Sequence, residues 1–143
     1  MNISFNRYST QEVFNLLVES SLLFTPPLSK EVDLRTYAFK LSNFAGFLVY
    51  KKQGKIIGYI AYYKNIQERQ IYIPLICVYP NFQHLGIGTQ MLNKLEDTFK
   101  VDFNTLGLEV VKRNMKAYNF YFKHNFHTKE DRGKRYYMEK SIK

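Results

Sequence analysis

The order of apolar and polar positions along the chain predicts helices and strands in a mixed arrangement. Apolar residues three and four positions apart, the spacing of an amphipathic helix, recur after Ser9, Ser29, Gly86 and Asn114. Extended segments rich in aliphatic and aromatic residues occupy 3–8, 46–51, 56–63, 71–79, 105–111 and 135–141. The predicted order is a strand, two helices, three strands, a helix, a strand, a helix and a final strand. Helices interspersed with strands indicate a mixed α/β fold built of layers.

Local signals mark the ends of several predicted elements. Ser9-Thr10-Gln11-Glu12 has the spacing of a capping box, and Thr25-Pro26-Pro27 ends the helix that begins there. Ser29 and Asn114 can cap two later helices. The segment 71–79 is apolar on both faces, which predicts a central strand. Pro74 lies inside this segment and cannot donate to a ladder, so we expect a bulge or a splayed position there. The charged segment 129–134 contains a glycine and predicts a turn before the last strand.

Length and composition narrow the class of protein. With 143 residues, of which 45% are hydrophobic, we expect one domain covering 1–143 with a packed core. The chain has neither an apolar run of the roughly 18 residues needed to span a membrane nor the pattern of a signal peptide at its start. Its single cysteine, Cys77, rules out an intrachain disulfide and favours the reducing cytoplasm.

The net charge of +9 is compatible with nucleic acid, an anionic membrane surface, a polyanionic small ligand or a solvated basic surface. The basic residues are spread along the chain, without a basic helix or arm. This distribution disfavours nucleic acid as a partner, and we expect no membrane partner.

The segment 80–89, Pro-Asn-Phe-Gln-His-Leu-Gly-Ile-Gly-Thr, carries most of the chemical information. It follows a predicted strand and opens a predicted helix, whose first amides have no intrahelical partner and sit at the positive end of the helix dipole. Glycine lets a phosphate approach the backbone closely, so this turn predicts a phosphate site. A dinucleotide fingerprint would need a third glycine, and a P-loop would need a lysine between Gly88 and Thr89. The histidines and Cys77 show no metal-ligand spacing, and we expect no metal.

Two stretches of the chain resemble one known family. Gln83-His84-Leu85-Gly86-Ile87-Gly88 matches the Gln/Arg-x-x-Gly-x-Gly/Ala signature of the GNAT-superfamily N-acetyltransferases, and Val78-Tyr79-Pro80 resembles the strand end before it. Further on, Leu108-Glu109-Val110 and then Asn114, Ala117, Tyr121, Lys123 and Phe126 resemble a second family segment. The chain departs from the family where Asn125 replaces a glycine and where Gln83 replaces the frequent arginine. Asn is the best non-glycine residue for a left-handed turn.

The resemblance implies a GNAT-like fold, with a central mixed, mostly antiparallel sheet, a splayed parallel strand pair and helices on both faces. It also implies an acyltransferase that uses acetyl-CoA as donor and co-substrate. The turn amides would hold the pyrophosphate, the strand at 76–78 would pair with the pantetheine arm, and Lys123, or else Arg113 or Lys116, would meet the 3′-phosphate. The coenzyme residues implied in this way are Ile76, Cys77, Val78, Gln83, His84, Leu85, Gly86, Ile87, Gly88, Thr89, Asn114 and Lys123.

Transfer of an acetyl group from a thioester to an amine needs a neutral amine, a donor for the oxyanion and a proton for the departing thiolate. By its match to the family's helix tyrosine, Tyr121 is the candidate general acid, with Tyr118 as its nearest rival. Glu109 is the candidate general base, alone or through water, and Glu68 is a weaker candidate. A buried strand thiol is usually inert, so we do not expect Cys77 to act as a nucleophile.

The acceptor is the least defined part of the prediction. The resemblance implies an acceptor site built by the N-terminal helices and their connection, with Phe24 and Tyr37 as candidate substrate residues. We expect the primary amine of a small molecule, such as an amino sugar or an acidic metabolite. A protein N-terminus or lysine remains open, as does a non-catalytic module that binds CoA or nucleic acid. Either a monomer or a homodimer is compatible with the sequence.

Overall fold

A single seven-stranded sheet, with the strand order β1-β2-β3-β4-β5-β7-β6, forms the centre of the molecule. The structure is a computed structural model and describes residues 2–143. All neighbouring strands are antiparallel except β4 and β5, which are parallel, so the predicted mixed sheet with one parallel pair is confirmed. The strands are β1 (Ile3–Asn6), β2 (Gly46–Lys52), β3 (Lys55–Asn65), β4 (Gln70–Val78), β5 (Thr105–Val111), β6 (His127–Asp131) and β7 (Arg135–Ser141).

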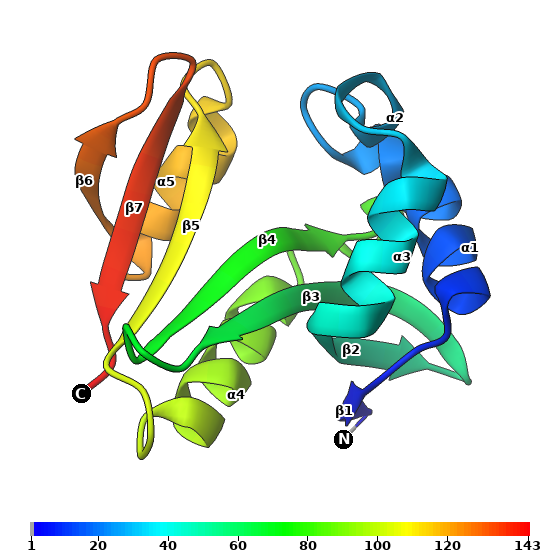
Figure 1. The fold of residues 1–143 in the computed structure, drawn as a ribbon, viewed down its shortest axis with the longest axis horizontal. Helices are drawn as coiled ribbons and strands as arrows, with labels where there is room; N and C mark the ends of the chain where they lie inside the picture. The colour runs from blue at the N-terminus through cyan, green and yellow to red at the C-terminus, as the bar shows by residue number, and fades with distance from the viewer. Residues whose placement is uncertain (1) are drawn as a thin grey trace.

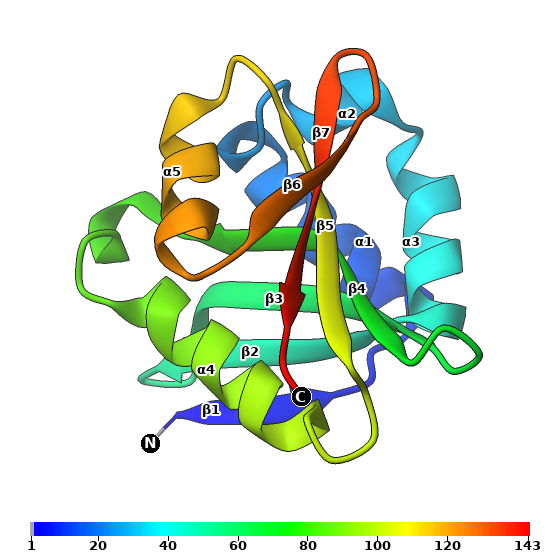
Figure 2. The same cartoon turned by 90° about the vertical axis from the view of Figure 1, so that its left-hand side faces the viewer.

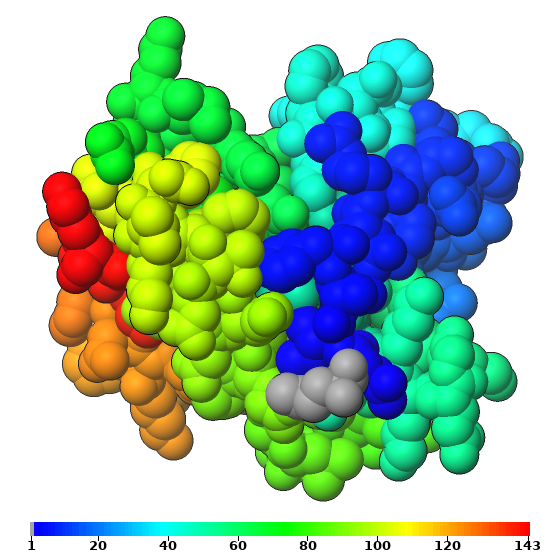
Figure 3. All heavy atoms as spheres, turned by 90° about the horizontal axis from the view of Figure 1, so that it is seen from below, coloured from blue at the N-terminus to red at the C-terminus, as the bar shows by residue number. Residues whose placement is uncertain are grey.

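The helices cover both faces of this sheet (Figures 1 and 2). One core lies between the sheet and α4 with α5, and the other lies between the sheet and α1 with α3. In the space-filling view from below, the N-terminal strand β1 lies against the yellow-green surface of α4 (Figure 3), where Phe5 meets Phe99 edge to face at 5.9 Å. The helices are α1 (Thr10–Ser20), α2 (Leu28–Glu31), α3 (Leu34–Phe44), α4 (Ile87–Phe99) and α5 (Met115–Lys123), with short 3-10 turns at η1 (Ser21–Leu23) and η2 (Pro80–Phe82).

A β-bulge at Pro74 decides where the sheet opens. Ile73 and Pro74 of β4 stand opposite the single residue Tyr62 of β3. Because of this extra residue, β4 changes the face that it presents: Ile73 packs in the core under α4, whereas Leu75 packs in the core under α1 and α3. The ladder between β4 and β5 also stops at Ile73, and Figure 1 shows the two strands separating beyond it. The predicted bulge and splayed strand are confirmed.

Two local predictions were wrong. Part of the predicted charged turn at 129–134 belongs to a seventh strand, β6, which pairs with the outer edge of β7. Every residue of β6 is exposed, so the segment lacks the apolar alternation that reveals a strand. The second predicted helix is divided: α2 ends at Glu31, and the side chain of Asp33, rather than that of Ser29, caps α3 by accepting from the amide of Thr36.

Candidate active site

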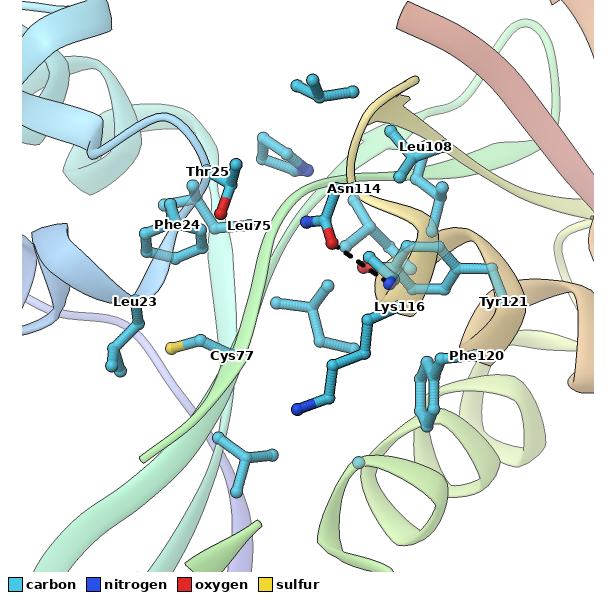
Figure 4. A pocket seen from close by; sticks show the side chains of 18 of the residues that line it. Leu23, Phe24, Thr25, Leu75, Cys77, Leu108, Asn114, Lys116, Phe120 and Tyr121 are labelled. Atoms are coloured by element: carbon cyan, nitrogen blue, oxygen red, sulfur yellow. Dashed lines mark hydrogen bonds between the residues drawn. The ribbon is translucent and has the colours of Figure 1, made fainter. Parts of the chain in front are cut away.

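A cleft of about 820 Å³ lies between β4 and β5 where the two strands separate. Its walls come from the loop after η1, from β4 and β5, from the turn before α4, and from α5. Figure 4 shows Phe24 and Cys77 on one side of the cleft and Phe120 and Tyr121, both from α5, on the other. The cleft therefore begins beside the bulge at Pro74, because the pairing of β4 with β5 stops at Ile73, directly before it.

The turn before α4 presents free backbone donors to this cleft. Helices α1, α3 and α5 each have a capping side chain, from Ser9, Asp33 and Asn114, but no side chain among residues 2–143 caps α4. Its N-cap residue, Gly86, has the left-handed φ of 80°, which disfavours side chains at this position. The first amides of α4 have no intrahelical acceptor and lie at the positive end of the helix dipole, so this turn can bind an anion.

Side chains from α5 and from its C-cap residue, His124, support the start of α4. A Cβ at Gly88 would lie 3.0 Å from the ring of Phe120, so glycine permits this close packing. The Nδ1 atom of His124 lies 2.7 Å from the carbonyl oxygen of Phe120, and its Nε2 atom lies 2.8 Å from Oγ1 of Thr89. Because a carbonyl can only accept, Nδ1 donates to Phe120, and this fixes the ring with Nε2 facing the hydroxyl of Thr89. His124 thereby orients the Thr89 hydroxyl.

Within the described part of the chain, the edge of β4 that faces the cleft has no strand partner beyond Ile73. On its other edge, Ile76, Cys77 and Val78 remain paired with β3. Burial raises the pKa of the Cys77 thiol to about 12, so the thiol is neutral at physiological pH and is a poor nucleophile. The Nε2 atom of Gln83 donates to the carbonyl of Val78 at 3.0 Å and fastens the turn to the end of the strand.

Tyr121 stands on the opposite wall with its side chain largely buried. Only 9% of the residue is exposed, and its ring meets Phe120 and Phe126 edge to face at 5.6 and 5.7 Å. Burial raises the pKa of the Tyr121 phenol, and the nearby thiol of Cys77 raises it further. The phenol is therefore a neutral proton donor throughout the physiological pH range. Tyr118, its rival in the sequence, instead bonds Thr128 at 2.9 Å through its hydroxyl and does not line the cleft.

Glu109 also lines the cleft, but its carboxylate is already engaged. Its Oε2 atom accepts from Nη1 of Arg132 at 2.8 Å, and Nε of the same guanidinium donates to Glu130 at 2.9 Å. The Arg132 guanidinium lies over the ring of Tyr137, 4.3 Å from its centroid. Arg132 belongs to the segment predicted as a charged turn, so this partner of Glu109 was not foreseen.

The cleft ends among aromatic and charged side chains of the N-terminal helices. Phe24 and Tyr37, the two candidate substrate residues, both line it. Burial raises the pKa of Tyr37, with smaller contributions from the hydroxyls of Tyr63 and Tyr72. At this end Nη2 of Arg135 in β7 lies 3.3 Å from Oε1 of Glu31 in α2, so an ion pair links β7 to α2 across the cleft.

Most of the candidate site residues converge on this one cleft. The exceptions are Leu85, which is 63% exposed within the turn, Lys123 at the end of α5, and the alternative candidates Glu68, Arg113 and Tyr118; none of these lines the cleft. The candidates that line it are Phe24, Tyr37, Ile76, Cys77, Val78, Gln83, His84, Gly86, Ile87, Gly88, Thr89, Glu109, Asn114 and Tyr121. The structure adds Tyr72, Phe120, His124 and Arg135, which carry no local sequence signal, and it brings Lys116 rather than Lys123 to the cleft.

Comparison with known proteins identifies the class. Residues 10–126 match the model of the Acetyltransferase (GNAT) family. The chain therefore belongs to the GNAT family and is an acetyl-CoA-dependent N-acetyltransferase. No curated protein matches the chain significantly in sequence.

Solved structures share the fold over nearly the whole chain. The protein smu.2055 of Streptococcus mutans UA159 has a TM-score of 0.80 and 18% identity, over 100% of both chains. PaiA N-acetyltransferase from Thermoplasma acidophilum, solved in complex with coenzyme A, has a TM-score of 0.76 and 19% identity, over 99% of both chains. The ribosomal-protein-S18-alanine N-acetyltransferase of Escherichia coli has a TM-score of 0.72 and 18% identity, over 98% of this chain and 94% of its own.

Two further observations concern residues 2–143. Their His, Cys, Asp and Glu side chains form no group of three or more that could hold a metal ion. None of their helices combines the length and the apolar character that crossing a membrane would require.

Proposed function

We propose that this chain transfers the acetyl group of acetyl-CoA to the primary amine of a small molecule. The observation that carries the proposal is the uncapped start of α4, with Gly86 in the left-handed region, at the edge of a cleft that also holds Tyr121 and Glu109. The first feature binds anions, and the second pair can move protons. One cleft thus combines a site for a phosphorylated donor with groups suited to amine acylation.

The residues present fit acetyl-CoA. The free amides at Ile87, Gly88 and Thr89 would hold the pyrophosphate through charge-assisted hydrogen bonds. The unpaired edge of β4 would bind the amide groups of the pantetheine arm as an added strand binds. The ammonium of Lys116 points into the cleft (Figure 4) and would add a positive charge near the phosphates. The fold shared with PaiA, which was solved with coenzyme A, supports this assignment.

The proposed chemistry divides between Glu109 of β5 and Tyr121 of α5. Acetyl-CoA supplies the activated acetyl group as a thioester. Glu109 accepts a proton from the acceptor ammonium, directly or through water, so that the amine becomes neutral and nucleophilic. As the C–N bond forms and the C–S bond breaks, Tyr121 donates its phenolic proton to the departing sulfur, and the phenolate regains a proton from the new amide nitrogen. Burial raises the pKa of this phenol, so it is protonated before the step.

The choice of a small acceptor rests on charge, because the net charge of +9 suits an acidic metabolite that carries an amine. The ion pair between Arg135 and Glu31 lies at the acceptor end of the cleft. It is exposed and held by one contact of 3.3 Å, so it does not exclude a peptide. Short peptides therefore belong in the acceptor panel as the competing case.

Calorimetric titration of acetyl-CoA into the protein and two glycine variants tests the proposal. Gly86 and Gly54 both have a left-handed φ, of 80° and 78°, and a Cβ at either position would meet nothing within 4 Å. Gly86→Asp places a negative charge in the phosphate site, whereas Gly54→Asp causes comparable backbone strain in the β2–β3 turn. We expect micromolar binding by the parent, similar binding by Gly54→Asp, and binding at least ~100-fold weaker by Gly86→Asp.

A thiol-release assay with an amine panel then tests turnover. Release of CoA that depends on an added amine supports the proposed function. The proposal would be overturned by a folded parent that does not bind acetyl-CoA, or by equal losses in the two glycine variants. Stronger turnover with peptides than with small amines would reject the small-molecule acceptor alone.

A further inference from the structure

Two arginines at the acceptor end of the cleft differ in how fully they are paired. Arg132 donates to two carboxylates, those of Glu109 and Glu130, at 2.8 and 2.9 Å. Among residues 2–143, the only carboxylate that Arg135 contacts is Glu31, through one contact of 3.3 Å. Both arginine side chains are 39% exposed, so solvent access does not explain the difference. Most of the donors on Arg135 therefore remain free for a ligand.

Arg135 is placed where an acceptor would enter. It lines the cleft together with Glu31, Tyr72 and Glu109. Its Nη2 atom reaches Oε1 of Glu31 in α2 at 3.3 Å, and Figure 2 shows the start of β7 at the upper edge of the molecule, away from the start of α4. The phosphate site and Arg135 thus occupy different parts of the same cleft.

The surroundings of Tyr72 show how closely the charged groups gather. Burial raises the pKa of Tyr72 to about 12, and the carboxylate of Glu109 raises it further, whereas the cations of Arg132 and Arg135 oppose this. The charges of Glu109, Arg132 and Arg135 therefore all affect the pKa of the Tyr72 hydroxyl. An acceptor bound beside Tyr72 would have a carboxylate within reach of its amine and an incompletely paired guanidinium within reach of another group.

We propose that the acceptor carries a carboxylate as well as its amine, and that Arg135 binds this carboxylate in place of Glu31. The inference rests on the proposed function. A guanidinium matches a carboxylate through two parallel hydrogen bonds, a geometry that its single contact with Glu31 does not use. An exposed ion pair held by one long contact contributes little, so an incoming carboxylate displaces Glu31 readily. In the absence of substrate, the carboxylate of Glu31 occupies the place of the substrate carboxylate and holds the guanidinium of Arg135 in position.

Matched acceptor pairs test the carboxylate requirement. β-Alanine is compared with n-propylamine, γ-aminobutyrate with n-butylamine, and free α-amino acids with their amides, in a CoA-release assay at saturating acetyl-CoA. We expect at least one carboxylate-bearing acceptor to exceed its partner by about tenfold or more in kcat/KM.

Three variants assign the effect to Arg135. Arg135→Gln should raise KM for the preferred carboxylate acceptor about 10- to 100-fold and leave its uncharged partner nearly unchanged. Glu31→Gln should lower that KM about two- to fivefold, because it removes the competing carboxylate. Lys129→Gln removes an exposed cation from β6, outside the cleft, and should change neither value more than about twofold.

The outcomes separate this inference from the function on which it rests. If uncharged amines react as well as every carboxylate-bearing partner, or if Arg135→Gln weakens both kinds of acceptor equally, the inference is wrong and the acetyltransferase assignment stands. If acetyl-CoA neither binds nor reacts with any amine, the proposed function fails first. An increase in KM with Glu31→Gln would also count against displacement.

Discussion

The two ends of the cleft are built in different ways. At the donor end, the start of α4 presents bare backbone amides that no side chain caps, within the short segment 83–89. At the acceptor end, Glu31, Glu109, Arg132 and Arg135 come from separate elements and pair with one another. A binding site made of backbone amides is present whenever the chain folds, whereas a site made of side-chain ion pairs changes with single substitutions. The donor end is therefore set by the fold, and the acceptor end by the identity of a few side chains.

The largest effect that we expect within the cleft comes from Tyr121→Phe, since it removes the proposed proton donor without changing ring packing. We expect kcat to fall about 10²- to 10⁴-fold, with the Kd for acetyl-CoA within about twofold of the parent. Because burial raises the pKa of this phenol, it stays protonated across the assay range, and the loss should be equal at neutral and mildly alkaline pH. Steady-state kinetics and calorimetry on the same samples measure both quantities.

Tyr118→Phe is the matched control for this prediction. The Tyr118 hydroxyl bonds Thr128 and does not line the cleft, so its removal should leave kcat within about twofold. Equal losses in the two variants would mean that packing of α5, rather than proton donation, is responsible. An unchanged kcat in Tyr121→Phe would assign the proton donor to another group.

A smaller effect is expected from Glu109→Gln, because water can partly replace a general base. We expect kcat to fall about 10- to 100-fold. Glu130→Gln removes the other carboxylate that Arg132 contacts, and it should change kcat less than about twofold. If both variants lose activity equally, Glu109 acts only by holding Arg132, and the base must be sought elsewhere on the cleft wall.

The features that were predicted from the sequence are those that depend on neighbouring residues. The capping box at Ser9 and the helix cap at Asn114 each join groups three residues apart, and both are present. Asn125 adopts the left-handed φ of 70° that its place in the motif implied. The bulge at Pro74 follows from one missing amide. In each case, the physical cause lies within a few positions of its effect.

The features that were missed join distant parts of the chain. The hydrogen bond between Thr89 and His124 links residues 35 positions apart, and the contact between Glu31 and Arg135 links residues 104 apart. No periodicity or motif in one segment specifies such a partner. The strand β6 was missed for a different reason, because its exposed edge position places no demand for apolar residues on its sequence.

The smallest effect that we expect distinguishes the two lysines of α5 at the donor end. The sequence match names Lys123, whereas the structure directs Lys116 into the cleft (Figure 4). Lys116→Gln should weaken acetyl-CoA binding about two- to fivefold, the size expected of one exposed charge beside phosphates. The difference from the parent should shrink as salt rises from about 0.05 M to about 0.5 M, because mobile ions screen exposed charges. Calorimetric titration at both salt concentrations measures it.

Lys123→Gln serves as the control with equal loss of charge on the same helix. We expect it to change the Kd for acetyl-CoA less than twofold at either salt concentration, because Lys123 does not line the cleft. A larger loss in Lys123→Gln than in Lys116→Gln would mean that the phosphates reach past the cleft to the end of α5, in favour of the sequence match. Equal, salt-insensitive losses would mean that neither lysine contacts a phosphate, and the backbone amides of α4 would then supply the attraction at the donor end.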